Sequence, residues 1–283
     1  MSFIKRIQVI LFFILPLYAV ASLAQNLPIV APGQYTKPGQ IVAEPGQIIP
    51  GTNPYGPKPL VIGVDTYTPP FSMRGGKGEL YGYDISMMNS LCKIMHRACQ
   101  FQPMKWVELL PAIMNNQIDL AVSSITITPE RTKNINFSLP YALSYSRFLT
   151  LSDTPVAEPF TFSLLNGKKI AVQEGTIYEN RASRIGIQNP IIKVYDNDPD
   201  ALKALTNKDV DYILLDNPTA LYWAANSSGA FKVVGKPFAY GFGIGIAVSR
   251  ADINLIPELN KAILEYQNSI DYRQNYHRFL ESF

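Results

Sequence analysis

The order of apolar and polar positions predicts strands alternating with helices from about residue 60 to the C-terminus. Short apolar or alternating runs bounded by polar residues are typical of strands, and they occur at 60–65, 99–103, 120–122, 146–151, 169–172, 192–195, 212–215 and 242–248. Apolar residues at helical spacing predict helices at 84–96, 106–116, 199–206, 257–267 and 272–280. Residues 153–166 show neither period and predict a loop. This alternation is typical of an α/β protein with parallel strands.

Candidate chemistry is concentrated directly after the apolar run 120–122. Three hydroxyl residues follow it, Ser123, Ser124 and Thr126. Thr128 and Pro129 then predict a helix start, with a capping oxygen and a ring that suits the first helical position. Arg131 falls in the first turn, where a cation opposes the helix dipole. A bound carboxylate explains that placement, because a guanidinium grips it with two parallel hydrogen bonds. The alternative is an exposed Arg131 that answers Glu130.

Several motifs resemble the periplasmic polar amino-acid-binding proteins, which are the soluble receptors of bacterial ABC importers. The resemblance is strongest for Ser-Ser-Ile-Thr-Ile-Thr-Pro-Glu-Arg at 123–131 and Asn-Phe-Ser-Leu-Pro-Tyr at 136–141. Further motifs match in the family's order at 63–65, 69–71, 82–84, 106–111, 175–176, 215–216 and 243–247. The resemblance is to solute-binding protein family 3, in its lysine/arginine/ornithine-, histidine-, arginine- and glutamine-binding type.

The resemblance implies the two-lobed periplasmic binding protein fold of type II, with two α/β lobes joined by two hinge strands near Phe148 and Gly243. Lobe one is expected at 60–147 plus 243–283, and lobe two at 148–242. Ligands of open α/β sheets bind beyond the carboxyl ends of the strands, and the polar clusters of this chain follow such ends. We therefore expect the ligand to bind where the two sheets face each other.

By resemblance, Arg131 binds the α-carboxylate of an amino acid together with three hydroxyl residues, Ser124, Thr126 and Thr176. Asp216 binds the α-ammonium. An amino acid offers one carboxylate and one ammonium a few ångströms apart, so an arginine and an aspartate in one cleft fit it. The alternative for Asp216, which precedes Asn217 and Pro218, is a helix N-cap.

The resemblance also assigns the ligand's side chain. Asp65 and Ser123 are expected to face it, Trp106 to stack on it, and Gln173 to lie close by. Asp65 has a turn-forming alternative after its strand, and Trp106 could be plain core. One departure concerns Thr68, which stands where members of the family that the chain resembles usually carry an aromatic residue; either the loop geometry differs or half of an aromatic sandwich is missing.

Cys92 and Cys99 are seven residues apart. On one continuous helix they would lie about 10 Å apart along the axis, beyond the roughly 7 Å between Cα atoms that a disulfide bridges. They can pair only if the helix ends near Arg97 and the chain turns into the strand at 99–103. We expect the disulfide in an oxidising compartment. Family members that bind basic amino acids share this spacing.

The first 59 residues differ in composition from the rest. Lys5 and Arg6 precede an apolar run at 7–20, and small residues precede Gln25, so 1–24 is expected to be a cleaved signal peptide. An uncleaved anchor is the alternative. Residues 25–59 hold eight of the 22 prolines and are expected to form a Pro/Gly-rich linker. The mature protein is therefore expected in the periplasm.

Composition limits the function. With 283 residues, 47% of them hydrophobic, the chain can bury one large or two small cores. A net charge of +3 is too small to indicate a nucleic-acid partner. His96, His277 and the two cysteines form no metal-ligand pattern. We expect no metal, no cofactor and no catalytic residue.

The resemblance implies a receptor that closes its lobes around a polar, basic amino acid and delivers it to the membrane permease of an ABC importer. Arginine is the expected ligand, with lysine and glutamine as competitors, and a monomer is expected. The first alternative is a dehydratase-like enzyme on the same scaffold. It needs a general acid or base, and Asp65 and Asp216 are better used as ion-pair partners. The second alternative is a sensory solute receptor.

Overall fold

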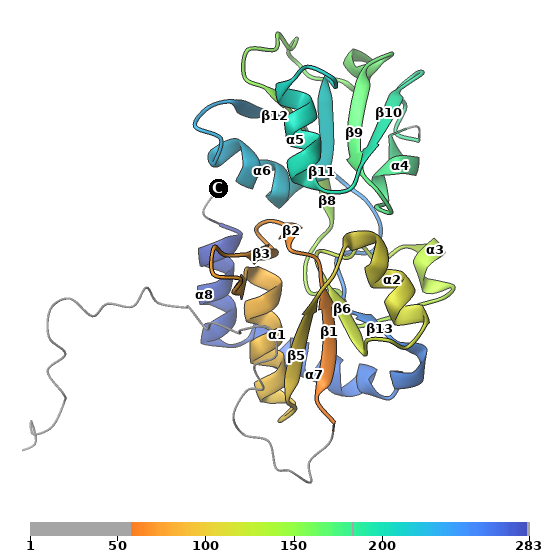
Figure 1. The fold of residues 1–283 in the computed structure, drawn as a ribbon, viewed down its shortest axis with the longest axis vertical. Helices are drawn as coiled ribbons and strands as arrows, with labels where there is room; N and C mark the ends of the chain where they lie inside the picture. Colours follow the sequence, from red (N-terminus) through yellow and green to blue (C-terminus); the bar gives the residue numbers. More distant parts are fainter. Residues whose placement is uncertain (1–57, 183, 282–283) are drawn as a thin grey trace, which may run out of the picture. The chain divides into compact units, whose positions relative to one another are not determined.

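The computed structural model describes residues 58–182 and 184–281 (Figure 1). The predicted signal peptide and all of the predicted linker except its last two residues lie outside these ranges. A first sheet has the strand order β5-β1-β6-β13-β7. Its strands are β1 Leu60–Val64, β5 Cys99–Pro103, β6 Leu120–Val122, β7 Asn136–Phe137 and β13 Ala247–Val248. β5, β1 and β6 are parallel, whereas β13 runs antiparallel to β6 and β7.

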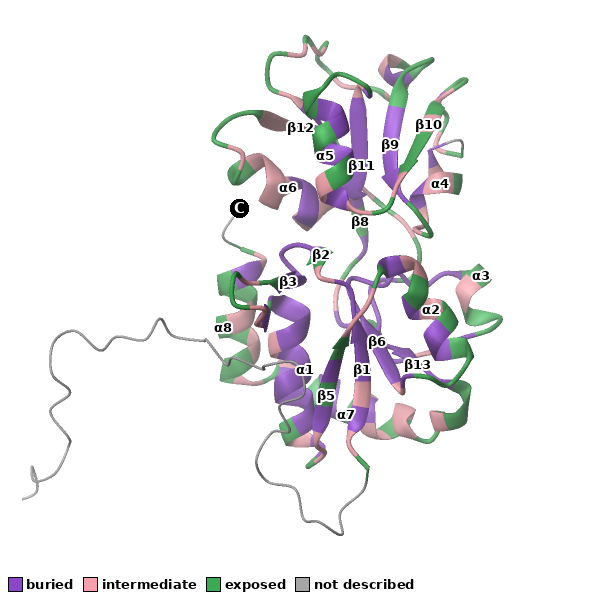
Figure 2. Ribbon diagram, viewed as in Figure 1, coloured by how far each residue is buried: buried purple, intermediate pink, exposed green. Residues whose placement is uncertain are grey.

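Helices cover both faces of the first sheet, because alternate residues of a strand point to opposite faces. Leu60, Ile62 and Val64 belong to a core shared with α1 Tyr83–Ile94 and with the C-terminal helices. Val61 points to the other face and packs against a second core, which lies under α2 Trp106–Met114. The buried parts of β1 and α1 are purple in Figure 2. The other helices are α7 Leu255–Gln267 and α8 Ile270–Phe279. We call this sheet and the elements packed on it lobe one.

A second sheet has the order β10-β9-β11-β8-β12. Its strands are β8 Tyr145–Leu151, β9 Lys169–Gln173, β10 Ile191–Tyr195, β11 Tyr212–Asp216 and β12 Phe231–Ala239. Its other elements are η1 Phe162–Leu165, α4 Tyr178–Arg181, α5 Asp198–Thr206 and α6 Asn217–Ala225. Two cores again lie on opposite faces, one under α4 and one under α5. We call this group lobe two; the exact lobe boundaries stay a prediction.

A small antiparallel sheet stands beside lobe one, at the end of β1. Its strands are β2 Tyr67–Thr68, β3 Ser72–Arg74 and β4 Leu80–Tyr81. β2 also contacts α5 of lobe two, so this small sheet reaches across between the lobes. The short helices α3 Pro129–Thr132 and η2 Arg250–Asp252 complete the described elements.

The predicted disulfide between Cys92 and Cys99 is present, with 6.2 Å between the Cα atoms. The helix that carries Cys92 ends at Ile94, between the two cysteines, and His96 has a φ of 51°. This left-handed residue reverses the chain so that β5 starts at Cys99. The condition set by the spacing, a helix end between the two cysteines, is therefore met.

The strand predicted at 242–248 is wrong in length, because regular pairing is limited to Ala247–Val248. Gly243 has a φ of 100°, and a Cβ there would lie 2.8 Å from the carbonyl oxygen of Ala142. The chain thus crosses between the lobes as an irregular segment, in which Ile244 forms isolated bridges to Thr126 and Ala142. Within the described ranges, no helix has both the length and the apolar character of a membrane span.

Candidate functional site

A cavity lies between the lobes, where the carboxyl ends of β6, β9 and β11 meet. Its volume of about 30 Å³ leaves room for little more than one or two water molecules. It is lined by Thr68, Trp106, Ser124, Thr126, Arg131, Gln173, Thr176, Ile177, Tyr178, Asp198, Leu214, Leu215, Asp216 and Thr219. This set includes seven of the nine residues predicted to bind ligand; the other two are Asp65 and Ser123.

Arg131 lies in α3, where Thr128 caps the helix by accepting a hydrogen bond from the Arg131 backbone N–H at 3.2 Å. Its guanidinium donates to the carbonyl oxygen of Thr126 at 2.8 Å and, across the cleft, to that of Gly175 at 3.5 Å. The guanidinium carbon lies 5.8 Å from the centre of the Trp106 ring. Burial lowers the pKa of Arg131, and the charge of Asp216 opposes that effect.

Asp216 ends β11 and is the N-cap residue of α6. Its carboxylate accepts a hydrogen bond from the Ser124 hydroxyl of lobe one at 2.7 Å and another from the Tyr178 hydroxyl of lobe two. Burial raises the pKa of Asp216, while these two hydrogen bonds and Arg131 lower it. The result is a carboxylate with donors on both sides of the cleft.

Ser124 has a φ of 53°, which is uncommon for a residue with a side chain. Its backbone N–H donates to Oδ2 of Asp84 at 2.9 Å, and the Tyr141 hydroxyl donates to Oδ1 at 2.8 Å. Asp84 is fully buried, and burial raises its pKa to about 7. Asp84 therefore holds the turn that directs the Ser124 hydroxyl across the cleft towards lobe two.

Asp65 and Ser123 lie behind the cavity wall, with 2% and 0% exposure. The Asp65 backbone N–H donates to the Ser123 hydroxyl at 2.8 Å, and Thr68 donates its hydroxyl to the Asp65 carboxylate at 2.7 Å. Burial raises the pKa of Asp65, and the Gln173 side chain is among the groups that lower it. Asp65 thus lies behind Thr68, which lines the cavity, whereas Ser123 joins the ends of β1 and β6.

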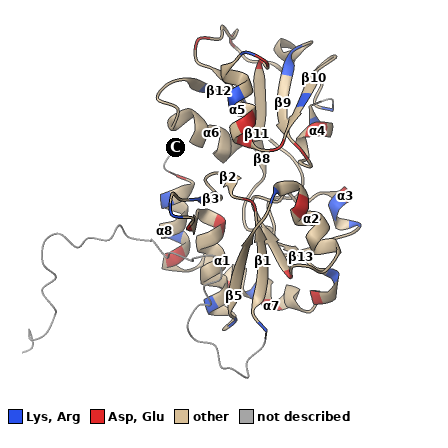
Figure 3. Ribbon diagram, in the orientation of Figure 1, with Lys and Arg blue, Asp and Glu red and all other residues tan. Residues whose placement is uncertain are grey.

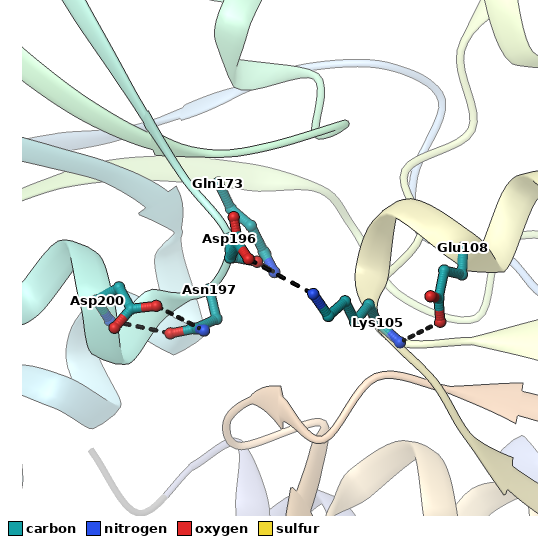
Figure 4. A network of polar contacts seen from close by, with 6 residues as sticks. All are labelled: Lys105, Glu108, Gln173, Asp196, Asn197 and Asp200. Atoms are coloured by element: carbon teal, nitrogen blue, oxygen red, sulfur yellow. Dashed lines mark hydrogen bonds and ion pairs between the residues drawn. The ribbon is translucent and has the colours of Figure 1, made fainter.

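Three further predicted residues line the cavity: Thr126 of lobe one, whose hydroxyl shares a hydrogen bond with that of Ser144 at 3.1 Å, and Gln173 and Thr176 of lobe two. Thr176 donates to the carbonyl oxygen of Gln173 at 2.7 Å, and the Gln173 amide donates to the carbonyl oxygen of Asp196 at 3.2 Å. The Asp196 carboxylate lies 3.6 Å from the Lys105 ammonium of lobe one, so one ion pair spans the cleft (Figure 4). Both side chains of this pair are more than 60% exposed.

Among the lining residues that the sequence analysis did not name are three with polar side chains, Tyr178, Asp198 and Thr219. Asp198 stands between Asn197 and Pro199, a sequence that reads as an ordinary helix start, and Thr219 sits in the first turn of a helix that was not predicted. Acidic residues stand in the first turn of α5, at the end of this helix that is nearest to lobe one in Figure 3. In the described parts of the chain, no group of three or more His, Cys, Asp or Glu could hold a metal ion.

Comparisons with known proteins agree with this geometry. The model of the bacterial extracellular solute-binding proteins, family 3, matches residues 60–282. The chain is 30% identical to the L-cystine-binding protein TcyJ of Escherichia coli K12, over 74% of this chain and 77% of the relative. It is 31% identical to the ABC transporter arginine-binding protein 1 of the same organism, over 71% and 82%.

A solved structure is similar over most of its length. It is the crystal structure of an arginine 3rd transport system periplasmic binding protein from Legionella pneumophila, with 33% identity and a TM-score of 0.73. The similarity covers 78% of this chain and 99% of that protein.

Proposed function

Because the chain belongs to family 3 of the bacterial extracellular solute-binding proteins, we propose that it is a receptor that binds one α-amino acid between its lobes. Its two-lobed α/β architecture is the type II periplasmic binding protein fold, so the fold class implied by the resemblance is confirmed. The observation that carries the proposal is the pair formed by Arg131 of lobe one and Asp216 of lobe two, which line one cavity.

This pair fits the two charges that every α-amino acid carries. The guanidinium of Arg131 supplies two parallel donors for the α-carboxylate, and Ser124 of lobe one and Thr176 of lobe two line the same cavity. Asp216 supplies the acceptor for the α-ammonium, and its hydrogen bonds to Ser124 and Tyr178 fix its position. Since the two charged residues come from different lobes, binding the zwitterion stabilises the closed arrangement. Thr126 of lobe one and Gln173 of lobe two also line the cavity around it.

The side chain of the proposed ligand ends in a positive charge, and arginine is its first candidate. Trp106 offers a face for a planar guanidinium, a contact worth about 0.5–2 kcal/mol, and Asp65 is an acid without a basic partner among the described salt bridges. Two of the compared relatives are arginine-binding proteins by name. Lysine and glutamine are the expected competitors.

The cavity as it stands is too small for an amino acid, since about 30 Å³ is far below the roughly 300 Å³ at which ligand pockets begin. Uptake of the ligand therefore requires the lobes to separate and then close. The hinge proposed for this motion consists of the segments near Phe148 and Gly243. The crossing at Gly243 is irregular, because Gly243 has a φ of 100° and regular strand pairing begins only at Ala247, and such a backbone suits a hinge.

The proposed receptor is directed to the periplasm by residues 1–24, which are then cleaved off. There it works as a monomer and delivers its amino acid to the permease of an ABC importer. The description of the family, solute-binding proteins, favours a receptor over the dehydratase-like enzyme. A sensory receptor would share the pocket but not the permease. Uptake of labelled ligand in cells with and without the gene separates these two roles.

Calorimetry with arginine, lysine and glutamine tests the pocket directly. We expect Arg131→Ala to lose about 2–5 kcal/mol of binding free energy for every ligand, because it removes one partner of a buried charge pair. Arg74→Ala is the matched control, since Arg74 is an exposed arginine of lobe one outside the cavity. Near wild-type affinity in a folded Arg131→Ala variant would refute the assignment.

A further inference from the structure

Asp198 is a buried acid that the zwitterion site does not use. It is the first residue of α5, is 4% exposed and lines the cavity. Its Oδ2 atom accepts a hydrogen bond of 3.3 Å from the indole N–H of Trp223. Within the described residues no basic side chain forms a salt bridge with it. Asn197 already caps this helix by accepting from the Asp200 backbone N–H, so helix capping does not explain a buried carboxylate at this place.

A second acid, Asp65 of lobe one, approaches Asp198 across the cleft. The strand β2, which ends at Thr68, contacts α5, which begins at Asp198, and Thr68 and Asp198 line the same cavity. The Thr68 hydroxyl in turn donates to the Asp65 carboxylate. Burial is the main reason that the pKa of Asp198 rises to about 8, and the charge of Asp65 raises it further. Two carboxyl groups therefore converge here without a counter-charge.

Thr219 provides a separate observation at the same place. This residue of α6 is 2% exposed and lines the cavity, and its hydroxyl has no hydrogen-bond partner among the described residues. An unpaired buried hydroxyl costs about 1–3 kcal/mol, so a native protein retains one where something else satisfies it. An N–H donor of a ligand would do so.

We infer that Asp198 and Thr219 of lobe two also bind the cationic end of the ligand's side chain, so that lobe two contributes to the selectivity for a basic ligand that the proposed function assigns to lobe one. This inference rests on the proposed function. Arg131 and Asp216 neutralise the zwitterion, which leaves the two other carboxyl groups for the side chain. A guanidinium or an ammonium offers several N–H donors and can bridge groups from both lobes.

Thr68 lies between the two acids. Its side chain lines the cavity together with Asp198, and its hydroxyl donates to the Asp65 carboxylate behind it. The positive charge of the side chain then adds a second link between the lobes, in addition to the zwitterion.

Calorimetric titrations with arginine, lysine and glutamine test the inference. We expect Asp198→Asn to weaken arginine and lysine by roughly tenfold or more and to change glutamine by less than about threefold, because only the first two bring a charge to the acid. Asp209→Asn is the matched control, an exposed aspartate beyond the other end of the same helix. It should leave all three affinities unchanged.

A second variant covers the case in which Asp198→Asn does not fold. Thr219→Val keeps the shape of the side chain and removes the unpaired hydroxyl, so the protein should be at least as stable to urea. It should nevertheless bind arginine and lysine more weakly. Equal losses for all three ligands in both variants would mean that the two residues only support the fold, and would overturn the inference.

Proton release gives an independent readout. A cation bound beside Asp198 lowers the pKa of that carboxyl, so binding of arginine near about pH 7 should release protons. Calorimetry in two buffers with different ionisation enthalpies measures the number released, and Asp198→Asn should release fewer. An unchanged number would contradict the role of Asp198. If wild type binds none of the three ligands, the proposed function itself fails; if it binds them and the variants keep its selectivity, only this inference fails.

Discussion

Asp84 is a fully buried acid, and its ionisation should make the stability of the protein depend on pH. Its two oxygens accept hydrogen bonds from the Ser124 backbone N–H and the Tyr141 hydroxyl, which favour the charged form. Burial outweighs them and raises the pKa from 3.8 to about 7, with a further contribution from the charge of Asp216. The perturbation that tests this balance is Asp84→Asn, which keeps the shape and removes the charge.

The sign follows from where each state holds the proton. Above about pH 4 the unfolded chain releases the Asp84 proton, whereas the folded protein keeps it until about pH 7. Folding is therefore favoured most at low pH by this group, and its contribution is lost as the pH rises from about 4 to about 7. With a pKa rise from 3.8 to about 7, the loss amounts to about 4 kcal/mol, at about 1.4 kcal/mol for each pH unit.

The assay is urea unfolding of wild type and Asp84→Asn at several pH values between about 4 and 8. Other buried acids contribute equally to both proteins, so the difference between the two curves isolates Asp84. We expect the variant to gain stability relative to wild type by roughly 4 kcal/mol across this range. Asp153→Asn, at a side chain that is 73% exposed, is the control and should show no such trend. A difference that stays constant with pH would show that Asp84 is charged throughout and would refute the reasoning.

Two further predictions concern the disulfide and the rim of the cleft. Replacing both Cys92 and Cys99 by serine should lower the free energy of unfolding by an amount at the low end of about 2–4 kcal/mol, because the closed loop is short. Urea unfolding of this variant and of wild type, both without reductant, measures the difference. Equal midpoints would contradict a stabilising disulfide. Lys105→Ala should change ligand affinity by less than about threefold, because exposed ion pairs contribute little and both side chains of the pair with Asp196 are more than 60% exposed. Calorimetry at two salt concentrations checks this, and a tenfold loss that persists at high salt would show that the pair acts as a latch.

The spacing of apolar residues predicted strands and helices well where the element has one buried face. The apolar run 120–122 became β6 with its predicted bounds, and Ser124, Thr126 and Arg131, which follow it, line the cavity. Arg131 could be found because a cation in a first helical turn conflicts with the helix dipole. That conflict is visible in one sequence, without any knowledge of the fold.

The parts that the sequence did not reveal depend on contacts between distant segments. Asp198 follows Asn197 and precedes Pro199, so its sequence indicates a helix start, and only the packing of α5 against β2 brings it to the cavity. β12 contains Gly235 and Pro237, which obscure a strand, and pairing with β8 maintains it despite a change of register. α6 has no clear apolar face, because it lies beside β8 and β12 at the edge of the cleft.

The position of β13 has a consequence for the order in which the protein acquires its structure. This strand comes from near the end of the chain, yet it fills the gap between β6 and β7 in the first sheet, and α7 packs on α1. The second sheet, in contrast, is built from one uninterrupted stretch, from β8 to β12. During synthesis from the N-terminus, the first sheet therefore cannot be completed until β13 has been made. The stretch from β8 to β12, although it is made after β1 to β7, contains all the strands of the second sheet before then. The usual rule that the segment made first folds first is inverted in this chain.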